Sequence, residues 1–404
     1  MKDNQTKMKK IFNKRLKILE LTNFSAGICG VWQRVKQESE FLVKKHEVMV
    51  FSSNATKGSN EFALREENLG RVKILRFSFK KLGGESFMSW FNKEAENEAL
   101  KFCPDIIICH SFRHPHTTKA LKIRDKLIKQ RKKCKVFLVT HAPFMEKNIS
   151  RSFISDLVVN SYDLFIAPKS LNKFDKVITI THWEEAYLNK LGINKDKIAY
   201  IPNGIPKEFF NTRNLVKKPR GILFLGRVAI IKNLEILIKA IKILRNKSLH
   251  NRKYEINLEI IGPVEEPYGA KLTKLIKQLD LDDKSKIVEF LPPIYNLKEK
   301  IQAYDRYEIF VLPSLRESHP QSLIEAMARG KIVISSSNLG GKEIIENEKN
   351  GFLFQIGNEK QLAEVIEKAI NLSKKEKKKI QEQAKKKAEE FKLNYLIKKL
   401  ERLF

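Results

Sequence analysis

Residues 309–336 carry the pattern that decides the fold, and they read IFVLPSLRESHPQSLIEAMARGKIVISS. Two short apolar, β-branched runs, 309–312 and 332–335, lie on either side of an apolar-periodic segment at 322–329. Near-continuous apolar strands that alternate with helices are typical of a parallel sheet covered on both faces. The stretch therefore predicts one strand–helix–strand unit of a doubly wound α/β sheet.

The same alternation runs along the chain in two series. The first series predicts strands at residues 16–21, 47–52, 72–77, 105–109, 135–140, 164–167, 177–180 and 198–201. The second predicts strands at 222–225, 257–261, 287–291, 309–312 and 332–335, with helices near 233–245, 269–279, 297–303, 322–329 and 359–372. From residue 374 onward a helical pattern has Ala384, Phe391, Tyr395 and Leu396 on its apolar side.

Between the two series, the turn Pro202-Asn203-Gly204 precedes a polar, basic stretch that we interpret as a linker to about residue 220. We therefore expect two tandem Rossmann-like parallel-sheet domains, 1–205 and 206–404, with the helix near 385–404 packing back on the first. Doubly wound sheets bind ligands at the carboxyl ends of their strands, so we expect the functional residues directly after the strands.

Composition favours a globular protein with a sizeable core. The 404 residues are 42% hydrophobic and 31% charged, which excludes wholesale disorder. No apolar run approaches the roughly 20 residues that span a bilayer, and the Lys-rich start lacks the apolar segment of a secretory signal. We expect a cytoplasmic protein whose four cysteines (Cys29, Cys103, Cys109, Cys134) are reduced.

The net charge of +31 is extreme and favours polyanionic partners. Residues 1–17, 119–135 and 371–404 carry seven, nine and twelve Lys or Arg against one, one and five acidic residues. Two interpretations remain open: a solvated surface, or a patch that meets an anionic membrane or phosphorylated ligand. A nucleic-acid-binding protein is the competing class, but the chain has no zinc-finger spacing, aromatic RNP-type strand or recognisable helix-turn-helix. No specific nucleic acid is expected.

Two carboxylates follow the strand at 309–312. Glu317 lies in the loop and Glu325 in the helix that follows, and the amide groups of Ser322 and Leu323 at its start could bind a phosphate. The alternative is purely structural, because Ser322-x-x-Glu325 also fits a capping box.

Two cations follow the strand at 222–225. Arg227 comes directly after Gly226, and Lys232 lies five residues further on. Such a pair beside a strand end can hold a diphosphate and stabilise it as a leaving group. The alternative is that both are ordinary surface cations.

These motifs, with their flanking residues, resemble those of a known family. The run LFLGRV…KN…LIKAI, then VLPSLRESHPQSLIEAMARGKIVISSSNLGGKEII…NGFLF, resembles the retaining nucleotide-sugar glycosyltransferases of family 4, which have the GT-B fold. In the N-terminal half, HEVMVF, PDIIICHS, VFLVTH and KIAYIPNGI stand in the family's order. The resemblance starts near residue 15 and covers nearly the whole chain. It implies a GT-B fold with a cleft between the two domains.

The resemblance implies residue roles on the donor side. Arg227 and Lys232 match the pair that grips the donor diphosphate. Glu317 matches the glutamate at the donor sugar, Glu325 matches the one that hydrogen-bonds the ribose, and Ile294 lies where the family places its nucleobase.

It also implies roles elsewhere. His141 matches a histidine near the transferred sugar, and Gly27 and Gly30 match a loop that approaches donor phosphates and acceptor. The family's usual Gly-Phe-Gly between the two glutamates is replaced by residues 318–321, which place His319 at the donor.

We expect no metal and no resident cofactor, with a nucleotide-diphosphate sugar as donor substrate and a lipid-linked or glycan acceptor, presented in the first case at the inner membrane surface. Asp280-x-Asp282 fits a metal motif literally, but we interpret it as a helix-to-strand turn. His110, His114 and His116 form a cluster that could bind metal or line the acceptor site. A nucleotide-sugar epimerase on the same fold remains an alternative enzyme.

Overall fold

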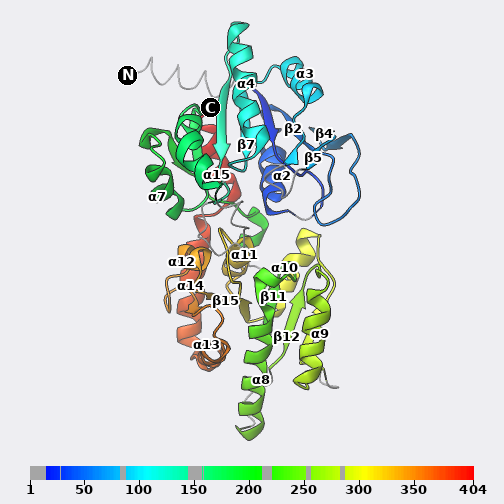
Figure 1. Cartoon of the computed structure of the whole chain (residues 1–404). Helices are drawn as coiled ribbons and strands as arrows, with labels where there is room; N and C mark the ends of the chain where they lie inside the picture. The colour runs from blue at the N-terminus through cyan, green and yellow to red at the C-terminus, as the bar shows by residue number, and fades with distance from the viewer. Residues whose placement is uncertain are drawn as a thin grey trace, which may run out of the picture. The chain divides into compact units, whose positions relative to one another are not determined.

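The computed structural model describes residues 15–27, 29–81, 88–143, 157, 159–211, 221–251, 256–282 and 287–404 (Figure 1). Contacts divide the chain into unit 1, Met1–Pro202 with Asn394–Phe404, and unit 2, Asn203–Leu393. The division falls three residues before the boundary expected at 205. It assigns 394–404 to unit 1 and 385–393 to unit 2, so only the last part of the segment expected to pack back on the first domain belongs to unit 1.

Unit 1 contains an eight-stranded sheet in the order β10-β9-β8-β7-β1-β2-β4-β3. All neighbours are parallel except β3 and β4. The strands are β1 (Lys17–Leu21), β2 (Glu47–Ser53), β3 (Glu66–Leu69), β4 (Val72–Phe77), β7 (Ile106–His110), β8 (Lys135–Val139), β9 (Lys176–Thr179) and β10 (Ile198–Tyr200), with β5 (Lys80–Lys81) and β6 (Met88–Ser89) as a separate pair. The helices are α2 (Gly30–Leu42), α3 (Lys93–Phe102), α4 (Pro115–Lys129), α6 (Ala167–Leu171), α7 (Trp183–Lys190) and α15 (Leu393–Glu401).

Unit 2 contains a fully parallel six-stranded sheet in the order β13-β12-β11-β14-β15-β16. Its strands are β11 (Ile222–Leu225), β12 (Leu258–Ile261), β13 (Val288–Leu291), β14 (Ile309–Leu312), β15 (Ile332–Ser336) and β16 (Phe352–Phe354). Its α-helices are α8 (Leu234–Asn251), α9 (Tyr268–Gln278), α10 (Leu297–Arg306), α11 (Gln321–Ala328), α12 (Leu339–Ile344), α13 (Glu359–Asn371) and α14 (Lys374–Glu389).

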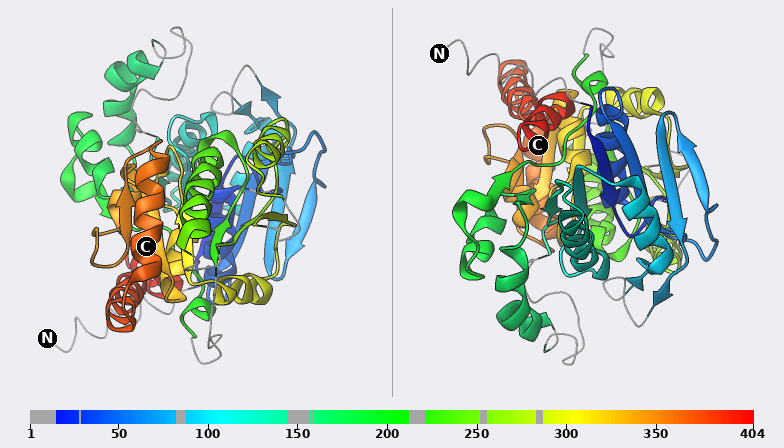
Figure 2. Two further views of the ribbon diagram at one scale, coloured as in Figure 1. Left: turned by 90° about the horizontal axis from the view of Figure 1, so that it is seen from below. Right: turned by 90° about the horizontal axis from the view of Figure 1, so that it is seen from above.

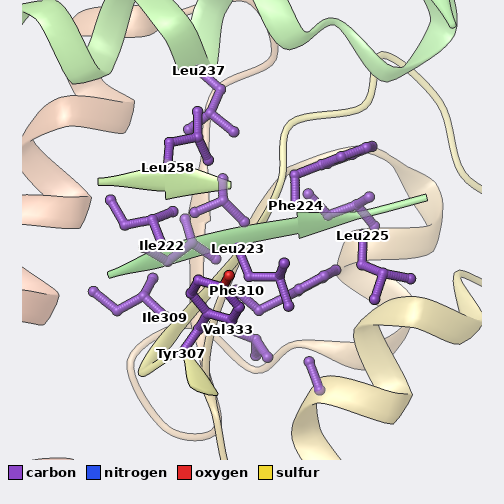
Figure 3. Close-up of a cluster of buried hydrophobic side chains, with 14 of the residues drawn as sticks. Ile222, Leu223, Phe224, Leu225, Leu237, Leu258, Tyr307, Ile309, Phe310 and Val333 are labelled. Atoms are coloured by element: carbon purple, nitrogen blue, oxygen red, sulfur yellow. The ribbon is translucent and has the colours of Figure 1, made fainter. Parts of the chain in front are cut away.

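Each sheet is covered by helices because its strands are apolar on both sides. Helices α2 and α4 pack against the strands of unit 1, and α11 and α13 against those of unit 2 (Figures 1 and 2). In unit 2 every residue of β11 is buried, and Leu237 of α8 is directed at Leu258 of the sheet (Figure 3). Burying one such side chain contributes roughly 1.5–3 kcal/mol, which fixes the strands beneath the helices. The predicted fold class, two Rossmann-like parallel-sheet α/β domains, is confirmed.

The strand predicted at 164–167 is wrong. Residues Tyr162–Ile166 form a π-helical turn that leads into α6, and Leu164 and Phe165 are exposed rather than buried in a sheet. A four-residue apolar run is too short for periodicity to separate strand from helix.

Two further segments differ from the sequence prediction. The edge strand β3 reads EENL and is largely exposed, so it lacks the apolar run that predicts a strand. The C-terminal helical pattern is split into α14 and α15, with Phe391 buried at the break and Tyr395 half exposed. Among the described helices, none combines the length and apolar composition needed to cross a bilayer.

Candidate active site

The strand order of unit 2 places two predicted loops side by side. β11 lies between β12 and β14, so the order reverses between β11 and β14. Gly226 and Arg227 follow β11, and Glu317 follows β14. A crevice at the carboxyl ends of strands where the order reverses is the general binding position of doubly wound sheets.

Lys232 and Glu317 meet at this position. The Lys232 ammonium donates to Glu317 Oε1 at 2.6 Å, and the Ser314 hydroxyl donates to the same oxygen at 2.6 Å. Both charged side chains are mostly buried, with 19% and 12% of their surface exposed. The first turn of α12 packs closely on Glu317, because a Cβ at Gly340 would lie 2.7 Å from the Cβ of Glu317. The pairing fixes the Glu317 carboxylate and neutralises Lys232 while no anionic ligand is bound.

Glu325 is buried on α11 and holds a separate set of contacts. The Lys300 ammonium lies 2.7 Å from each carboxylate oxygen, and the Tyr304 hydroxyl donates to Oε2 at 2.8 Å. Burial, together with the Glu325 carboxylate, raises the pKa of Tyr304 well above its ordinary value, so the phenol keeps its proton.

The capping-box alternative is wrong. Helix α11 begins at Gln321, its N-cap is Pro320, and no side chain caps it. Ser322 and Leu323 therefore lie inside the first turn, where amide groups are the ones left for an external acceptor.

The remaining residues of unit 2 that were predicted to contact the donor lie at the same end of the sheet and differ in exposure. Arg227 forms an ion pair with Glu265, and both side chains are more than 40% exposed. His319 is buried against the ring of Phe391, with ring centres 5.1 Å apart. Ile294 is half-buried after β13.

In unit 1 the glycine loop after β1 differs at its two glycines. Gly27 has a φ of +78°, and a Cβ there would lie 2.2 Å from the carbonyl oxygen of Lys57, so this position requires glycine. Gly30 is the first residue of α2, and an added Cβ would meet no atom within 4 Å. Only Gly27 is therefore required by the fold.

His141 is the second residue after β8 and has a φ of +58°. Its Nε2 lies 3.0 Å from Nδ1 of His110, whose Nε2 lies 2.8 Å from Glu20 Oε2. His110 and Glu20 are fully buried. The hydrogen-bond partner of His141 is therefore His110, which was predicted to cluster with His114 and His116 instead.

The three-histidine cluster does not form a single site. His116 donates from Nε2 to the backbone carbonyl of His110 at 2.8 Å and packs on Trp90. His114 contacts the Asn23 amide at 2.7 Å. His116 is therefore a structural core residue.

Glu20, Glu38 and His110 place potential metal-ligand atoms within 4.8 Å of one another. However, Arg34 donates to Glu38 at 2.8 Å, and Glu20 accepts from Ser39 at 3.2 Å besides its bond to His110. We therefore assign this group to a buried hydrogen-bond network. The Asp280-x-Asp282 motif lies in the turn after α9, with Asp280 at a φ of +50°.

The partners of the candidate carboxylates are not evident from the sequence. Lys300 and Tyr304 are four residues apart on α10, hence on one helix face, and Ser314 is three residues before Glu317. Their spacing is visible in the sequence, but nothing there says that α10 lies beside α11.

Two doubly wound parallel-sheet units, with a cation–carboxylate cluster at the strand ends of the second, are the architecture of GT-B glycosyltransferases. Residues 28–209 match the profile described as Glycosyltransferase Family 4, and residues 206–387 match Glycosyl transferases group 1. The two profiles together cover most of the chain, which therefore belongs to the GT-B glycosyltransferase family that they define.

Two of the curated relatives are named as bacterial biosynthesis glycosyltransferases. The amylovoran biosynthesis glycosyltransferase AmsK of Erwinia amylovora is 31% identical over 274 residues, 66% of this chain and 61% of that protein. The putative colanic acid biosynthesis glycosyltransferase WcaL of Escherichia coli K12 is 25% identical over 295 residues, 71% of this chain and 66% of the relative. The chain thus matches less than two thirds of the length of these relatives.

Solved structures agree on the fold. A glycosyltransferase from Rickettsia africae superposes with a TM-score of 0.70 at 19% identity, covering 96% of this chain and 97% of that one. Sucrose-phosphate synthase from Thermosynechococcus elongatus gives a TM-score of 0.70 at 18% identity, covering 96% and 98%.

Proposed function

We propose that the protein is a glycosyltransferase that moves a sugar from a nucleotide-diphosphate sugar to an acceptor with retention of anomeric configuration. The observation that carries the proposal is the Lys232–Glu317–Ser314 cluster at the carboxyl ends of β11 and β14. Membership of the GT-B family supports the same assignment.

The cluster suits a diphosphate because its cation can change partner. A donor diphosphate brings two negative charges and competes with Glu317 for the Lys232 ammonium. Arg227, paired only at the surface with Glu265, supplies a second cation at the same strand end. As the glycosidic bond breaks, charge grows on the leaving diphosphate, and fixed cations stabilise that charge without reorganising.

When Lys232 moves to the diphosphate, the Glu317 carboxylate can bind the donor sugar. Ser314 still donates to Oε1, so the carboxylate keeps its orientation and can accept a hydrogen bond from the donor sugar. Glu325 is assigned to the ribose, and the cations replace the divalent metal that other transferases use to bind a diphosphate.

For the acceptor, we propose a lipid-linked saccharide used in polysaccharide assembly at the inner face of the cell membrane. One relative, from Campylobacter jejuni, is named N,N'-diacetylbacillosaminyl-diphospho-undecaprenol alpha-1,3-N-acetylgalactosaminyltransferase, and is 29% identical over 182 residues. In unit 1, α4 and the residues after it expose Lys122, Lys126, Lys129, Arg131, Lys132, Lys133 and Lys135. Each basic residue near an anionic leaflet contributes roughly 1 kcal/mol. The basic N-terminal segment also falls partly outside the described residues, which begin at 15.

A thermal-shift screen against UDP, GDP, ADP and their sugars tests the donor assignment. We expect one nucleoside diphosphate to stabilise the protein by mass action and Lys232→Met to abolish that shift, with Lys239→Met, an exposed lysine on α8, as the matched control. NMR of the product's anomeric centre then tests retention. Donor consumption without acceptor would instead indicate an epimerase, and salt-sensitive nucleic-acid binding with no nucleotide shift would overturn the proposal.

A further inference from the structure

Glu20, His110 and His141 form a hydrogen-bonded chain in unit 1. Glu20 lies in β1, His110 ends β7, and His141 follows β8. β7 is hydrogen-bonded to both β1 and β8, so its last residue can contact groups from each neighbour. The two links measure 2.8 Å between Glu20 Oε2 and His110 Nε2, and 3.0 Å between His110 Nδ1 and His141 Nε2.

With both imidazoles neutral, proton counting allows this hydrogen-bonded chain only two arrangements. A neutral imidazole has one N–H donor and one bare nitrogen acceptor. If Glu20 is protonated, it donates to His110 Nε2, His110 donates from Nδ1 to His141, and His141 carries its own proton on Nδ1. If Glu20 is ionised, every link reverses and His141 Nδ1 becomes an acceptor.

The Nδ1 atom of His141 is the open end of the chain. Among the residues that the structure describes, none bonds to it, and His141 is half-buried whereas Glu20 and His110 are fully buried. The protonation state of Glu20 therefore determines whether His141 Nδ1, two hydrogen bonds away, carries a proton.

We propose that Glu20 and His110 are positioning residues that set whether His141 presents an N–H donor or a bare nitrogen to the saccharide. The saccharide as ligand rests on the proposed function, whereas the control of the His141 tautomer does not.

Neighbouring charges leave this chain intact. Arg34 on α2 donates to Glu38 at 2.8 Å and to the carbonyl of Ile201 at 3.0 Å. Its positive charge acts to lower the pKa values of Glu20, His110 and His141. Glu38 Oε2 lies 3.8 Å from His110 Nε2, too far for a hydrogen bond. The other titratable side chain whose charge acts on His141 is His114.

Burial of the Glu20–His110–His141 hydrogen-bonded chain favours the arrangement in which His141 Nδ1 is a donor at neutral pH. Burial raises the pKa of Glu20 to about 8, opposed by the Ser39 hydroxyl and the Arg34 charge. Burial lowers the pKa of His110 to about 4 and that of His141 well below its ordinary value. At pH 7 Glu20 is therefore protonated, both imidazoles are neutral, and His141 Nδ1 is a donor.

Raising the pH reverses the chain. One proton leaves to solvent from His141 Nδ1, the proton on His110 Nδ1 moves to His141 Nε2, and the proton of Glu20 moves to His110 Nε2. The protein loses one proton, and the negative charge resides on Glu20. His141 then accepts where it previously donated.

Two-bond ¹H–¹⁵N NMR of protein labelled at histidine tests this directly, with His141 assigned through His141→Asn. We expect the wild type to carry the His141 proton on Nδ1 at pH 7 and on Nε2 above about pH 8. Glu20→Gln, which can donate from its amide at every pH, should keep the proton on Nδ1 at pH 9. Ser39→Ala is the matched control, because it removes a bond to Glu20 outside the chain and should keep Nδ1–H at pH 7.

A His141 proton on Nε2 in the wild type at pH 7, or no difference between the wild type and Glu20→Gln at pH 9, would overturn the inference. The pH profile of turnover gives a second readout. We expect turnover to fall tenfold per pH unit above about pH 8 in the wild type and to stay level in Glu20→Gln. Absence of transferase activity in the wild type would contradict the proposed function, while the NMR result would still decide the tautomer.

Discussion

Replacing Lys232 with methionine removes the ammonium that neutralises Glu317 and keeps most of the side-chain volume. The pair is 2.6 Å long and its side chains are 19% and 12% exposed, so it lies between a surface pair and a buried one. A surface ion pair contributes at most about 1 kcal/mol, and breaking a fully buried pair costs about 3–5 kcal/mol. With only Ser314 left on Glu317 Oε1, we expect the free energy of unfolding of unit 2 to fall by about 1–3 kcal/mol.

Arg227→Met provides the contrast that separates stability from catalysis. Arg227 and Glu265 are 43% and 48% exposed, so losing this pair should lower the free energy of unfolding by less than about 1 kcal/mol. Both cations are assigned to the departing diphosphate. Each substitution should therefore remove about 2–4 kcal/mol of transition-state stabilisation, which lowers kcat/KM roughly 30- to 1000-fold.

Denaturant unfolding and steady-state kinetics of a double-mutant cycle measure these terms. In a Glu317→Gln background, Lys232→Met should cost little stability because the uncompensated charge is gone. Lys239→Met controls for the loss of a lysine on α8 and should change neither stability nor kcat/KM. Equal stability losses for Lys232→Met and Arg227→Met, or an absence of coupling to Glu317, would refute the buried-pair reasoning; unchanged kcat/KM in both variants would refute the diphosphate assignment.

Four further predictions follow from the described contacts. Glu325→Gln should mainly weaken nucleoside-diphosphate binding, whereas Glu317→Gln should mainly lower kcat, because its proposed partner is the reacting sugar. Calorimetry and steady-state kinetics distinguish the two effects, and normal values for both variants would return these residues to a structural role. Turnover should survive EDTA, and loss on chelation with rescue by manganese would contradict metal independence. Burial raises the pKa of Glu20 to about 8 in the folded protein, so its contribution to stability is complete below about pH 4.5 and is lost as the pH rises through 8. Between pH 6.5 and 8 this group should lower the free energy of unfolding by up to about 1.4 kcal/mol per pH unit. Glu20→Gln should remove that slope in urea titrations. Binding to anionic vesicles at low salt should exceed binding to neutral ones and weaken in a variant with Lys129, Lys132 and Lys133 changed to Gln; equal binding to both vesicle types would favour a soluble acceptor.

Local periodicity was enough to predict most of the sheet. The strands at 72–77, 222–225 and 309–312 have the bounds expected from the sequence, because each is a short buried apolar run between polar turns. The rule that ligands bind at the carboxyl ends of parallel strands then selected the loops that hold Arg227 and Glu317. The rule works from the sequence because the carboxyl end of a strand is known once the strand is predicted, whereas side-chain contacts depend on which elements are neighbours.

Motif matching failed because α11 starts two residues earlier than a capping box on Ser322 requires. Ser322-x-x-Glu325 has the spacing of a capping box, but α11 begins at Gln321, which moves Ser322 into the helix and turns Glu325 toward Tyr304. Helix ends are the least certain part of any sequence prediction, and a cap depends on the end. The Glu325 carboxylate consequently has its partners on another helix, α10, which no local pattern could identify.

The buried chain to His141 was hidden for a different reason, although one signal was present. Glu20 and His110 are 90 residues apart and meet because β1 and β7 are neighbours at the point where the strand order of unit 1 reverses. Within β1, Glu20 interrupts the apolar residues of 18–21, which read ILEL. A buried carboxyl in such a strand must find a proton or a hydrogen-bond partner, since leaving it ionised and unpaired is costly. In a doubly wound sheet the polar residues able to supply that partner lie at the ends of the adjacent strands. A lone acid near the end of the first strand therefore indicates a polar partner at the end of whichever strand lies beside it, and in this chain that partner is His110.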